Sequence, residues 1–195
     1  WTLPAADGSA NQVLKTDGSG VLAWVNNSGV AGAIDDLTDG KSGGTDFTGS
    51  MILGHQTTGT LNNAQYNTAV GINAMDALTS GDYNTAIGKD ALTANTEGIS
   101  STAIGYTALQ SNTTGDYNTA SGAHALQSNT TGHYNVAVGN EALKSNIDGY
   151  YNVATGTNAL TFNTSGNHNI AMGHQALKTN TTGIRNIAIG SNAYE

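Results

Sequence analysis

Several residue types that define common classes of protein are absent or scarce in this chain of 195 residues. It contains no Cys, which excludes disulfides, thiolate catalysis and cysteine-based metal sites. No apolar run approaches the roughly 18 residues of a membrane span, and no signal peptide is recognisable, so we expect no membrane insertion. The chain starts at Trp1 without a Met, which suggests a segment of a longer polypeptide.

Charge and large apolar side chains are also scarce. Charged residues make up 10% of the chain, against about 25% in an average protein, and the net charge is −8. A sparse acidic surface offers few cations to phosphates, so nucleic acids and anionic membranes are not expected as partners. Apolar residues reach only 37%, and many of them are Ala, so a compact globular core is not expected either.

What the chain does contain is a repeat of 17 residues. The first complete unit starts at Tyr66, and the others follow without insertion or deletion. The segment SMILG at 50–54 fits one period earlier as a degenerate unit. Ala stands at positions 4 and 9 of each unit and Gly at positions 6 and 16, while position 10 is usually Leu. The two Gly columns predict two corners per unit, where the backbone turns with φ > 0 or approaches a neighbour closely.

Positions 2–5 of the unit have the alternation of a β-strand. They read mostly Asn-(Thr/Val/Ile)-Ala-(Ile/Val), so positions 3 and 5 are predicted to form one face, opposite Asn and Ala. The phrase Asn-Thr-Thr-Gly, as at 112–115, is typical of a turn, because Asn tolerates left-handed conformations and bonds its own backbone.

We therefore predict an all-β fold, a parallel β-solenoid (β-roll) of 17-residue coils in which equivalent positions stack about 4.8 Å apart. Helical repeats are the alternative, disfavoured because Gly or Asn would break each helix, although a short helical turn at positions 7–11 stays open. The residues predicted to form the repeated core are Ala86, Ile87, Gly88, Ala91, Leu92, Ala103, Ile104, Gly105, Ala108, Leu109, Ala137, Val138, Gly139, Ala142, Leu143, Ala171, Gly173, Ala176 and Leu177.

A single stack of such coils has little apolar surface to bury. Each coil offers three or four medium-sized apolar side chains at about 1.5–3 kcal/mol each, while ordering each of its 17 residues costs about 1–2 kcal/mol. We therefore expect the chain to bury one flank against copies of itself as a homotrimer, with the all-Ala face as the contact.

The repeat resembles two groups of known proteins. The phrases NTAIG (84–88), STAIG (101–105), NVAVG (135–139) and NIAIG (186–190) resemble the core of the head repeats in YadA-like trimeric autotransporter adhesins. The longer phrase NTAIGxxALxxNTTGxY is similar to repeats of bacteriophage tail-fibre proteins, and LPAADGSANQVLKTDGSGVLAW at 3–24 resembles a module that precedes their shafts. The period of 17 is longer than the usual adhesin-head repeat.

This resemblance implies a trimeric parallel β-roll that binds host surfaces. The expected function is a rigid tail-fibre shaft that presents a receptor-binding surface for host attachment, located in the virion or otherwise outside the cell. The expected partners are two further copies of the chain, other fibre or virion components, and a cell-surface glycan or protein receptor. The alternative is a bacterial surface adhesin head or extracellular filament; a remote alternative is ice binding by Thr ladders, which Val136 and later apolar residues at position 3 interrupt.

The chain divides into three predicted regions. Two apolar runs around Asp-Gly-Ser-Gly at 11–25 are typical of a hairpin, so 1–28 is assigned to a small β-hairpin module. Residues 29–49 mix Gly, Asp and Ser without periodicity and are expected to be a connector. Residues 50–195 are assigned to the solenoid.

No constellation of catalytic residues interrupts the repeat, so we expect no enzyme activity, cofactor or metal. A trimer could bring three copies of one His to its axis and bind a metal there, but surface or packing roles are favoured. An acidic group could gather Ca²⁺, but it lacks the spacing of a calcium loop. The five His are His55, His124, His133, His168 and His174, and the acidic group is Asp35, Asp36 and Asp39.

Two recurrent patterns could instead bear on sugars. The N-glycosylation pattern occurs at Asn112, Asn129, Asn163 and Asn180, where turn geometry explains it without a glycan. Tyr recurs at position 1, which would form an aromatic ladder if the coils stack. It is a candidate glycan contact, although ring-on-ring stacking that stabilises the rod is the favoured interpretation. The ladder residues are Tyr66, Tyr83, Tyr117, Tyr134 and Tyr151.

Overall fold

The chain is seen in a computed structural model, which describes residues 12–16, 19, 21–26, 40–42, 51–53 and 63–194. Strands and turns make up these residues, and no helix occurs among them. Strand β1 (Gln12–Thr16) pairs antiparallel with β2 (Leu22–Asn26), with Leu14 opposite Trp24. The remaining strands belong to a second, ten-stranded sheet.

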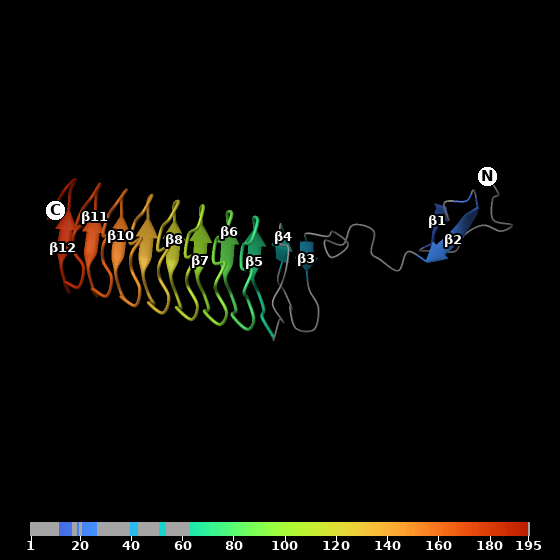
Figure 1. Cartoon of the computed structure of the whole chain (residues 1–195), viewed down its shortest axis with the longest axis horizontal. Helices are drawn as coiled ribbons and strands as arrows, with labels where there is room; N and C mark the ends of the chain where they lie inside the picture. The colour runs from blue at the N-terminus through green and yellow to red at the C-terminus, as the bar shows by residue number, and fades with distance from the viewer. Residues whose placement is uncertain are drawn as a thin grey trace.

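The ten-stranded sheet follows the order of the chain, from β3 at one edge to β12 at the other (Figure 1). From β4 onward each strand pairs in parallel with the next, and β3 pairs antiparallel with β4. The strands are β3 (Gly40–Ser42), β4 (Met51–Leu53), β5 (Thr68–Val70), β6 (Thr85–Ile87), β7 (Thr102–Ile104), β8 (Thr119–Ser121), β9 (Val136–Val138), β10 (Val153–Thr155), β11 (Ile170–Met172) and β12 (Ile187–Ile189).

The pairing register confirms that 17 residues make one coil of a parallel β-solenoid. Ala69 pairs with Ala86, and every later strand continues the same offset. Met51 pairs with Thr68, so the degenerate unit at 50–54 also contributes a strand in register. Strand β3 shows that the sheet begins inside the range 29–49 that the sequence assigned to a connector.

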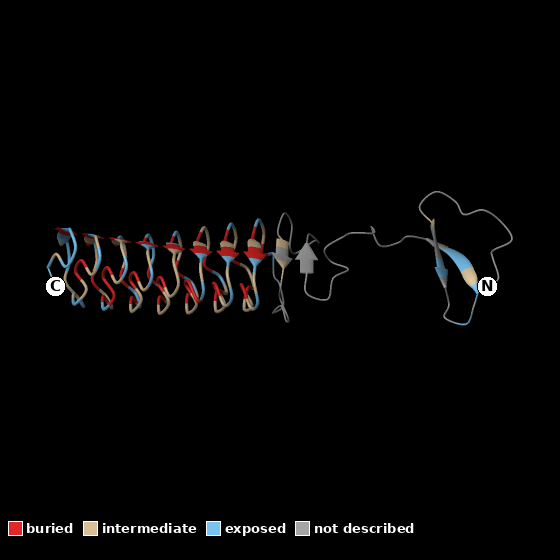
Figure 2. Ribbon diagram, turned by 90° about the horizontal axis from the view of Figure 1, so that it is seen from above, coloured by how far each residue is buried: buried red, intermediate tan, exposed pale blue. Residues whose placement is uncertain are grey.

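The interior of each coil is narrow and is lined by small side chains. The Ala residues at positions 4 and 9 and the Leu at position 10 are buried in coil after coil, as the recurring red segments in Figure 2 show. This confirms the core prediction for Ala86, Ala91, Leu92, Ala103, Ala108, Leu109, Ala137, Ala142, Leu143, Ala171, Ala176 and Leu177.

The prediction was wrong for the larger strand residues. Ile87 and Ile104 are each 42% exposed and Val138 is 39% exposed, because positions 3 and 5 point away from the interior when Ala at position 4 points into it. The Ala face is consequently closed within the chain itself and cannot be the contact between copies. The face that remains open is the one formed by positions 3 and 5.

Two buried columns of Asn run through the stack and bond each coil to its neighbours. At position 13, Asn129 Nδ2 donates to Asn112 Oδ1 at 2.8 Å and to the Gly132 carbonyl at 2.9 Å. At position 2, Asn135 N donates to Asn118 Oδ1 at 3.0 Å. The sequence predicted the bond from Asn to the backbone of its own turn, but these Asn do not adopt the left-handed conformation.

The two Gly columns are required for different reasons. Gly88, at position 6, has φ of +135°, which side chains rarely adopt. Gly132, at position 16, lacks a positive φ, but a Cβ there would lie 2.4 Å from both the Gly149 carbonyl and Asn129 Oδ1. The first column therefore turns the chain, and the second lets adjacent coils approach.

Left-handed residues other than Gly recur at positions 1, 8 and 10, with φ between +50° and +61°. Leu109 is one of them, although the left-handed region costs a residue with a side chain about 1–2 kcal/mol. The conformation lets its N–H donate to the Ala125 carbonyl of the next coil at 3.0 Å. Left-handed residues at positions 8 and 10 also rule out the short helical turn left open at positions 7–11.

We expect the Asn column to be a main source of stability. Replacing Asn129 with Ala leaves the buried amide of Asn146 and the Gly132 carbonyl each without one hydrogen-bonding partner. The midpoint of chemical denaturation should fall, by the equivalent of about 1–3 kcal/mol. Replacing the exposed Thr131 of the same turn with Ala is the control and should change stability by less than about 0.5 kcal/mol. Equal effects of the two substitutions would contradict this role.

Candidate functional site

The aromatic ladder at position 1 is the most distinctive feature of the outer surface. Its backbone is left-handed in every coil, with the buried Asn of position 2 following it, and each Tyr of the column is exposed. Rings in adjacent coils stack face to face: Tyr117 and Tyr134 are 4.9 Å apart between centroids at 4° between planes. Tyr134 and Tyr151 are 4.8 Å apart at 11°.

The ladder is divided into two runs. Tyr66 and Tyr83 form the first, with centroids 4.9 Å apart. Ser100 then occupies position 1, and the second run continues through Tyr117, Tyr134, Tyr151 and His168.

Residues at position 17 widen the second run into an aromatic patch. The ring of His133 lies edge-on to Tyr134 at 5.8 Å, and Tyr150 lies edge-on to Tyr151 at 5.6 Å. Desolvation in this patch raises the pKa of Tyr134, and nearby Tyr151 adds to the effect. The patch therefore combines apolar ring edges with phenol hydroxyls that stay protonated at neutral pH.

Stacking limits what the ladder can bind. The predicted ring-on-ring packing is confirmed, and it covers both faces of an inner ring such as Tyr134. Inner rings therefore present edges and hydroxyls to solvent, and ring faces are open only where a run stops. A glycan contact at Tyr66, Tyr83, Tyr117, Tyr134 or Tyr151 remains a prediction, with the ends of the runs as its best places.

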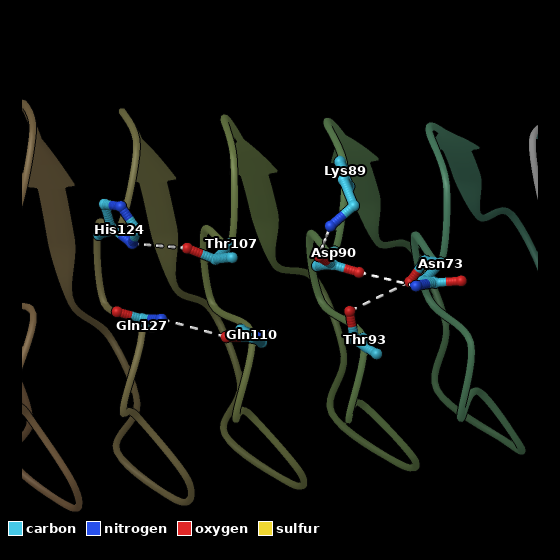
Figure 3. A network of polar contacts seen from close by, with 8 residues as sticks. All are labelled: Asn73, Lys89, Asp90, Thr93, Thr107, Gln110, His124 and Gln127. Carbon is cyan, nitrogen blue, oxygen red and sulfur yellow. Dashed lines mark hydrogen bonds and ion pairs between the residues drawn. The ribbon is translucent and has the colours of Figure 1, made fainter.

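A second outer surface, formed by positions 7, 8 and 11, carries polar contacts between coils (Figure 3). Asp90 accepts hydrogen bonds from Lys89 Nζ and from Asn73 Nδ2, both at 2.8 Å. Thr93 Oγ1 donates to the Asn73 carbonyl at 3.1 Å. Lys89 also lies 5.4 Å from the centre of the Tyr106 ring. These side chains satisfy one another, as expected for a stabilising surface network.

The same surface continues in the next coils with different residues. Thr107 Oγ1 and His124 Nδ1 are 2.8 Å apart, and Gln127 Nε2 donates to Gln110 Oε1 at 3.1 Å (Figure 3). Each pair is 17 residues apart, so side chains in the variable columns are matched to their neighbours along the stack. Sequence analysis treated these columns as independent, although the 17-residue offset would have revealed the pairs.

The His residues serve in packing rather than in a common site. His124 bonds Thr107 and lies against Tyr106, His133 and His168 belong to the aromatic patch, and His174 is exposed. Within the part of the chain that the structure describes, no three His, Asp or Glu residues gather as a metal site. His55, Asp35, Asp36 and Asp39 lie outside the described residues.

The four glycosylation patterns coincide with the buried Asn column at position 13. Asn112, Asn129 and Asn163 are buried, and the amide of Asn180 donates to Asn163 Oδ1 at 2.8 Å. Their amide nitrogens are thus used inside the fold, in agreement with the turn interpretation.

No known protein family, curated protein or solved structure was found to match this chain. Among the described residues, no helix is long and apolar enough to cross a membrane.

We expect an inner ring of the ladder to contribute more stability than a terminal one. Tyr134→Leu removes two stacked contacts and Tyr83→Leu removes one, and an aromatic pair contributes about 0.5–1.5 kcal/mol beyond its buried area. Chemical denaturation should therefore show Tyr134→Leu to be more destabilising by about one such pair. If both variants unfold at the same denaturant concentration, the rings do not act through stacking.

The polar surface should also make stability depend on acid. Hydrogen bonds from Lys89 and Asn73 lower the pKa of Asp90 below its ordinary 3.8, and Lys144 lowers that of Glu141 below 4.5. A carboxyl group with a lowered folded-state pKa contributes stability that is complete above the ordinary pKa and is lost as pH falls through the lowered one.

The double variant Asp90→Asn, Glu141→Gln should thus unfold at a lower temperature than the unmodified chain at pH 7. The difference should be small for surface pairs, and it should vanish as the pH is lowered below 3.8. Thermal unfolding followed by circular dichroism across pH 2–7 measures it. Asp148→Asn, at an exposed carboxylate, is the control. A difference that persists unchanged at low pH would contradict the assignment.

Proposed function

We propose that the solenoid is a structural shaft of a bacteriophage tail fibre, assembled as a homotrimer and presenting a surface for host attachment. The observation that carries this proposal is the open apolar face on the strands. It runs through successive coils at position 5, where Val70, Ile87, Ile104, Val138 and Met172 are exposed. Extended apolar surfaces of this kind on a folded chain mark contacts with a partner.

The face has the geometry that a symmetric assembly needs. The strands repeat in register, so the same side chains recur at the spacing of a parallel sheet, about 4.8 Å. Copies arranged around a common axis parallel to the stack would each bury this face against the next copy, coil by coil. A trimer is the arrangement that the quoted repeat motifs imply.

The stack also supports a mechanical role. Every coil is bonded to the next by backbone hydrogen bonds and by Asn side chains, so bending the stack would strain many bonds together. In a one-dimensional repeat, each coil contacts only its neighbours, and length follows directly from the number of coils. A stiff rod with side chains arranged in columns suits the task of holding a binding surface away from a particle.

A bacterial surface adhesin head or filament is the second candidate. It is favoured by the phrases NVAVG (135–139) and NIAIG (186–190), which resemble adhesin-head repeats. Both candidates share the trimeric rod and differ in what carries it.

Oligomeric mass tests the assembly. Light scattering coupled to size-exclusion chromatography should give three times the mass of one chain. Ile104→Lys combined with Val138→Lys should reduce it to one, because six charges would otherwise be buried in the trimer. Asn140→Lys, an exposed change on another face, should leave the trimer intact. A single-chain mass before any substitution would overturn the proposal that the face is a subunit contact.

Electron microscopy tests the carrier. Gold-labelled antibodies raised against residues 63–194 should decorate the fibres of phage particles if the protein is a tail-fibre shaft. Labelling of a bacterial surface would support the adhesin instead. Absence of label from both would overturn both candidates.

A further inference from the structure

The break in the aromatic ladder at Ser100 lacks a ring but keeps the backbone of the ladder. Ser100 has φ of +54°, close to the +55° of Tyr117 and +60° of Tyr83. Its N–H donates to the Asp82 carbonyl at 2.9 Å, as the N–H of Tyr117 does to the Ile99 carbonyl at 3.0 Å. Position 1 is thus built normally in this coil, and what is missing is a planar group between two tyrosines.

The size of the break follows from the ladder itself. Neighbouring rings lie 4.9 Å apart on either side of it, so the Tyr83 and Tyr117 rings are separated by about twice that spacing. Tyr83 is 59% exposed, whereas Tyr117, which also borders the break, is 46% exposed. Two ring faces therefore border a slot one planar group thick, with the small Ser100 at its base.

A carboxylate lies at the level of the slot. Asp116 precedes Tyr117 but reaches back one coil, where its Oδ1 accepts the Ile99 N–H at 2.8 Å. Since Ile99 is the residue before Ser100, this bond holds the carboxylate beside the missing ring. Within the described part of the chain, its second oxygen makes no other hydrogen bond or ion pair.

The electrostatic surroundings of the slot are negative. Positions 15, 17 and 1 of the first three units include Asp82, Glu97 and Asp116 and contain no Lys, Arg or His. Lys89 belongs to the same coils, but it lies on the surface of position 7, where Asp90 holds it at 2.8 Å. The whole chain carries a net charge of −8. A cation is therefore attracted to this slot and meets no like charge there.

We propose that the slot between Tyr83 and Tyr117 binds the guanidinium group of an arginine side chain presented by a partner protein. A guanidinium is planar, stacks on aromatic faces and donates paired hydrogen bonds to a carboxylate. The two ring faces match its planarity, and Asp116 matches its charge and its donors. A neutral aromatic ring would use the faces but not the carboxylate, and a Lys ammonium would use the carboxylate but is not planar.

This site goes beyond the shaft function, because it gives one coil a binding property that the other coils lack. It also adds specificity to a surface that is otherwise regular. The inner rings of the second run cannot offer it, since each of their faces already contacts a neighbouring ring.

The test uses short blocked peptides as probes and the full chain as target. Ac-Gly-Arg-Gly-amide is titrated while NMR follows the ring protons of Tyr83 and Tyr117, with the Lys and Tyr peptides and methyl glucoside as comparators. We expect the Arg peptide to shift these two rings at lower concentrations than any comparator, and to leave the Tyr134 ring unchanged.

Two variants examine the slot and the carboxylate separately. Ser100→Tyr completes the ladder, so it should abolish binding while preserving or raising stability; Thr131→Tyr adds the same ring at an exposed position elsewhere and should leave binding intact. Asp116→Asn keeps the oxygen that accepts the Ile99 N–H, as Asn167 does for Tyr150 N at 2.8 Å in the same column. It should weaken binding about 2–5-fold, the value of an exposed ion pair.

The outcomes separate the possible occupants. Equal shifts from the Arg and Tyr peptides, or shifts from methyl glucoside alone, would replace the guanidinium with an aromatic ring or a sugar and overturn the proposal. Binding that survives Ser100→Tyr would place the site elsewhere and overturn it too. None of these outcomes changes the oligomeric mass, so failure here is distinct from failure of the shaft proposal.

Discussion

The whole structure depends on each residue being stacked on its own counterpart 17 positions away. A polar side chain buried in such a stack must be satisfied by a copy of itself. Asn meets this condition because its amide carries both a donor and an acceptor, so Asn129 can donate to Asn112 and accept from Asn146 at once. A column of Asp would place like charges together, and a column of Leu would leave the turn carbonyls without partners.

The same constraint explains why the outer surface carries the function. Adjacent coils approach so closely that the interior accepts Ala, one Leu and two Asn per coil, and the larger strand residues Ile87 and Ile104 are left outside. Apolar surface that a wider fold would bury is instead displayed along the sheet, where it suits a subunit contact. The Tyr column is outside for the same reason and gains stability from its own repetition.

Sequence reasoning predicted the period, the parallel stack and the Ala and Leu columns, because these follow from identity and size at fixed spacing. It placed the wrong strand face inside: period-2 alternation defines two faces, and the rule that larger apolar residues are buried fails in an interior this narrow. It also missed the left-handed Leu109, a conformation that bonds between coils support against local preference. Ser100 was visible as an irregular start of a unit, but only the ring spacings gave that irregularity a shape.

One consequence of the Gly132 column concerns how such a chain changes in evolution. Because Gly at position 16 lets one coil seat directly on the next, the two surfaces of a coil are complementary to each other. Duplication or loss of one genetic unit encoding 17 residues would lengthen or shorten the rod without creating a new interface. A shift of a single codon would misalign all downstream columns, so length can vary freely only in whole steps.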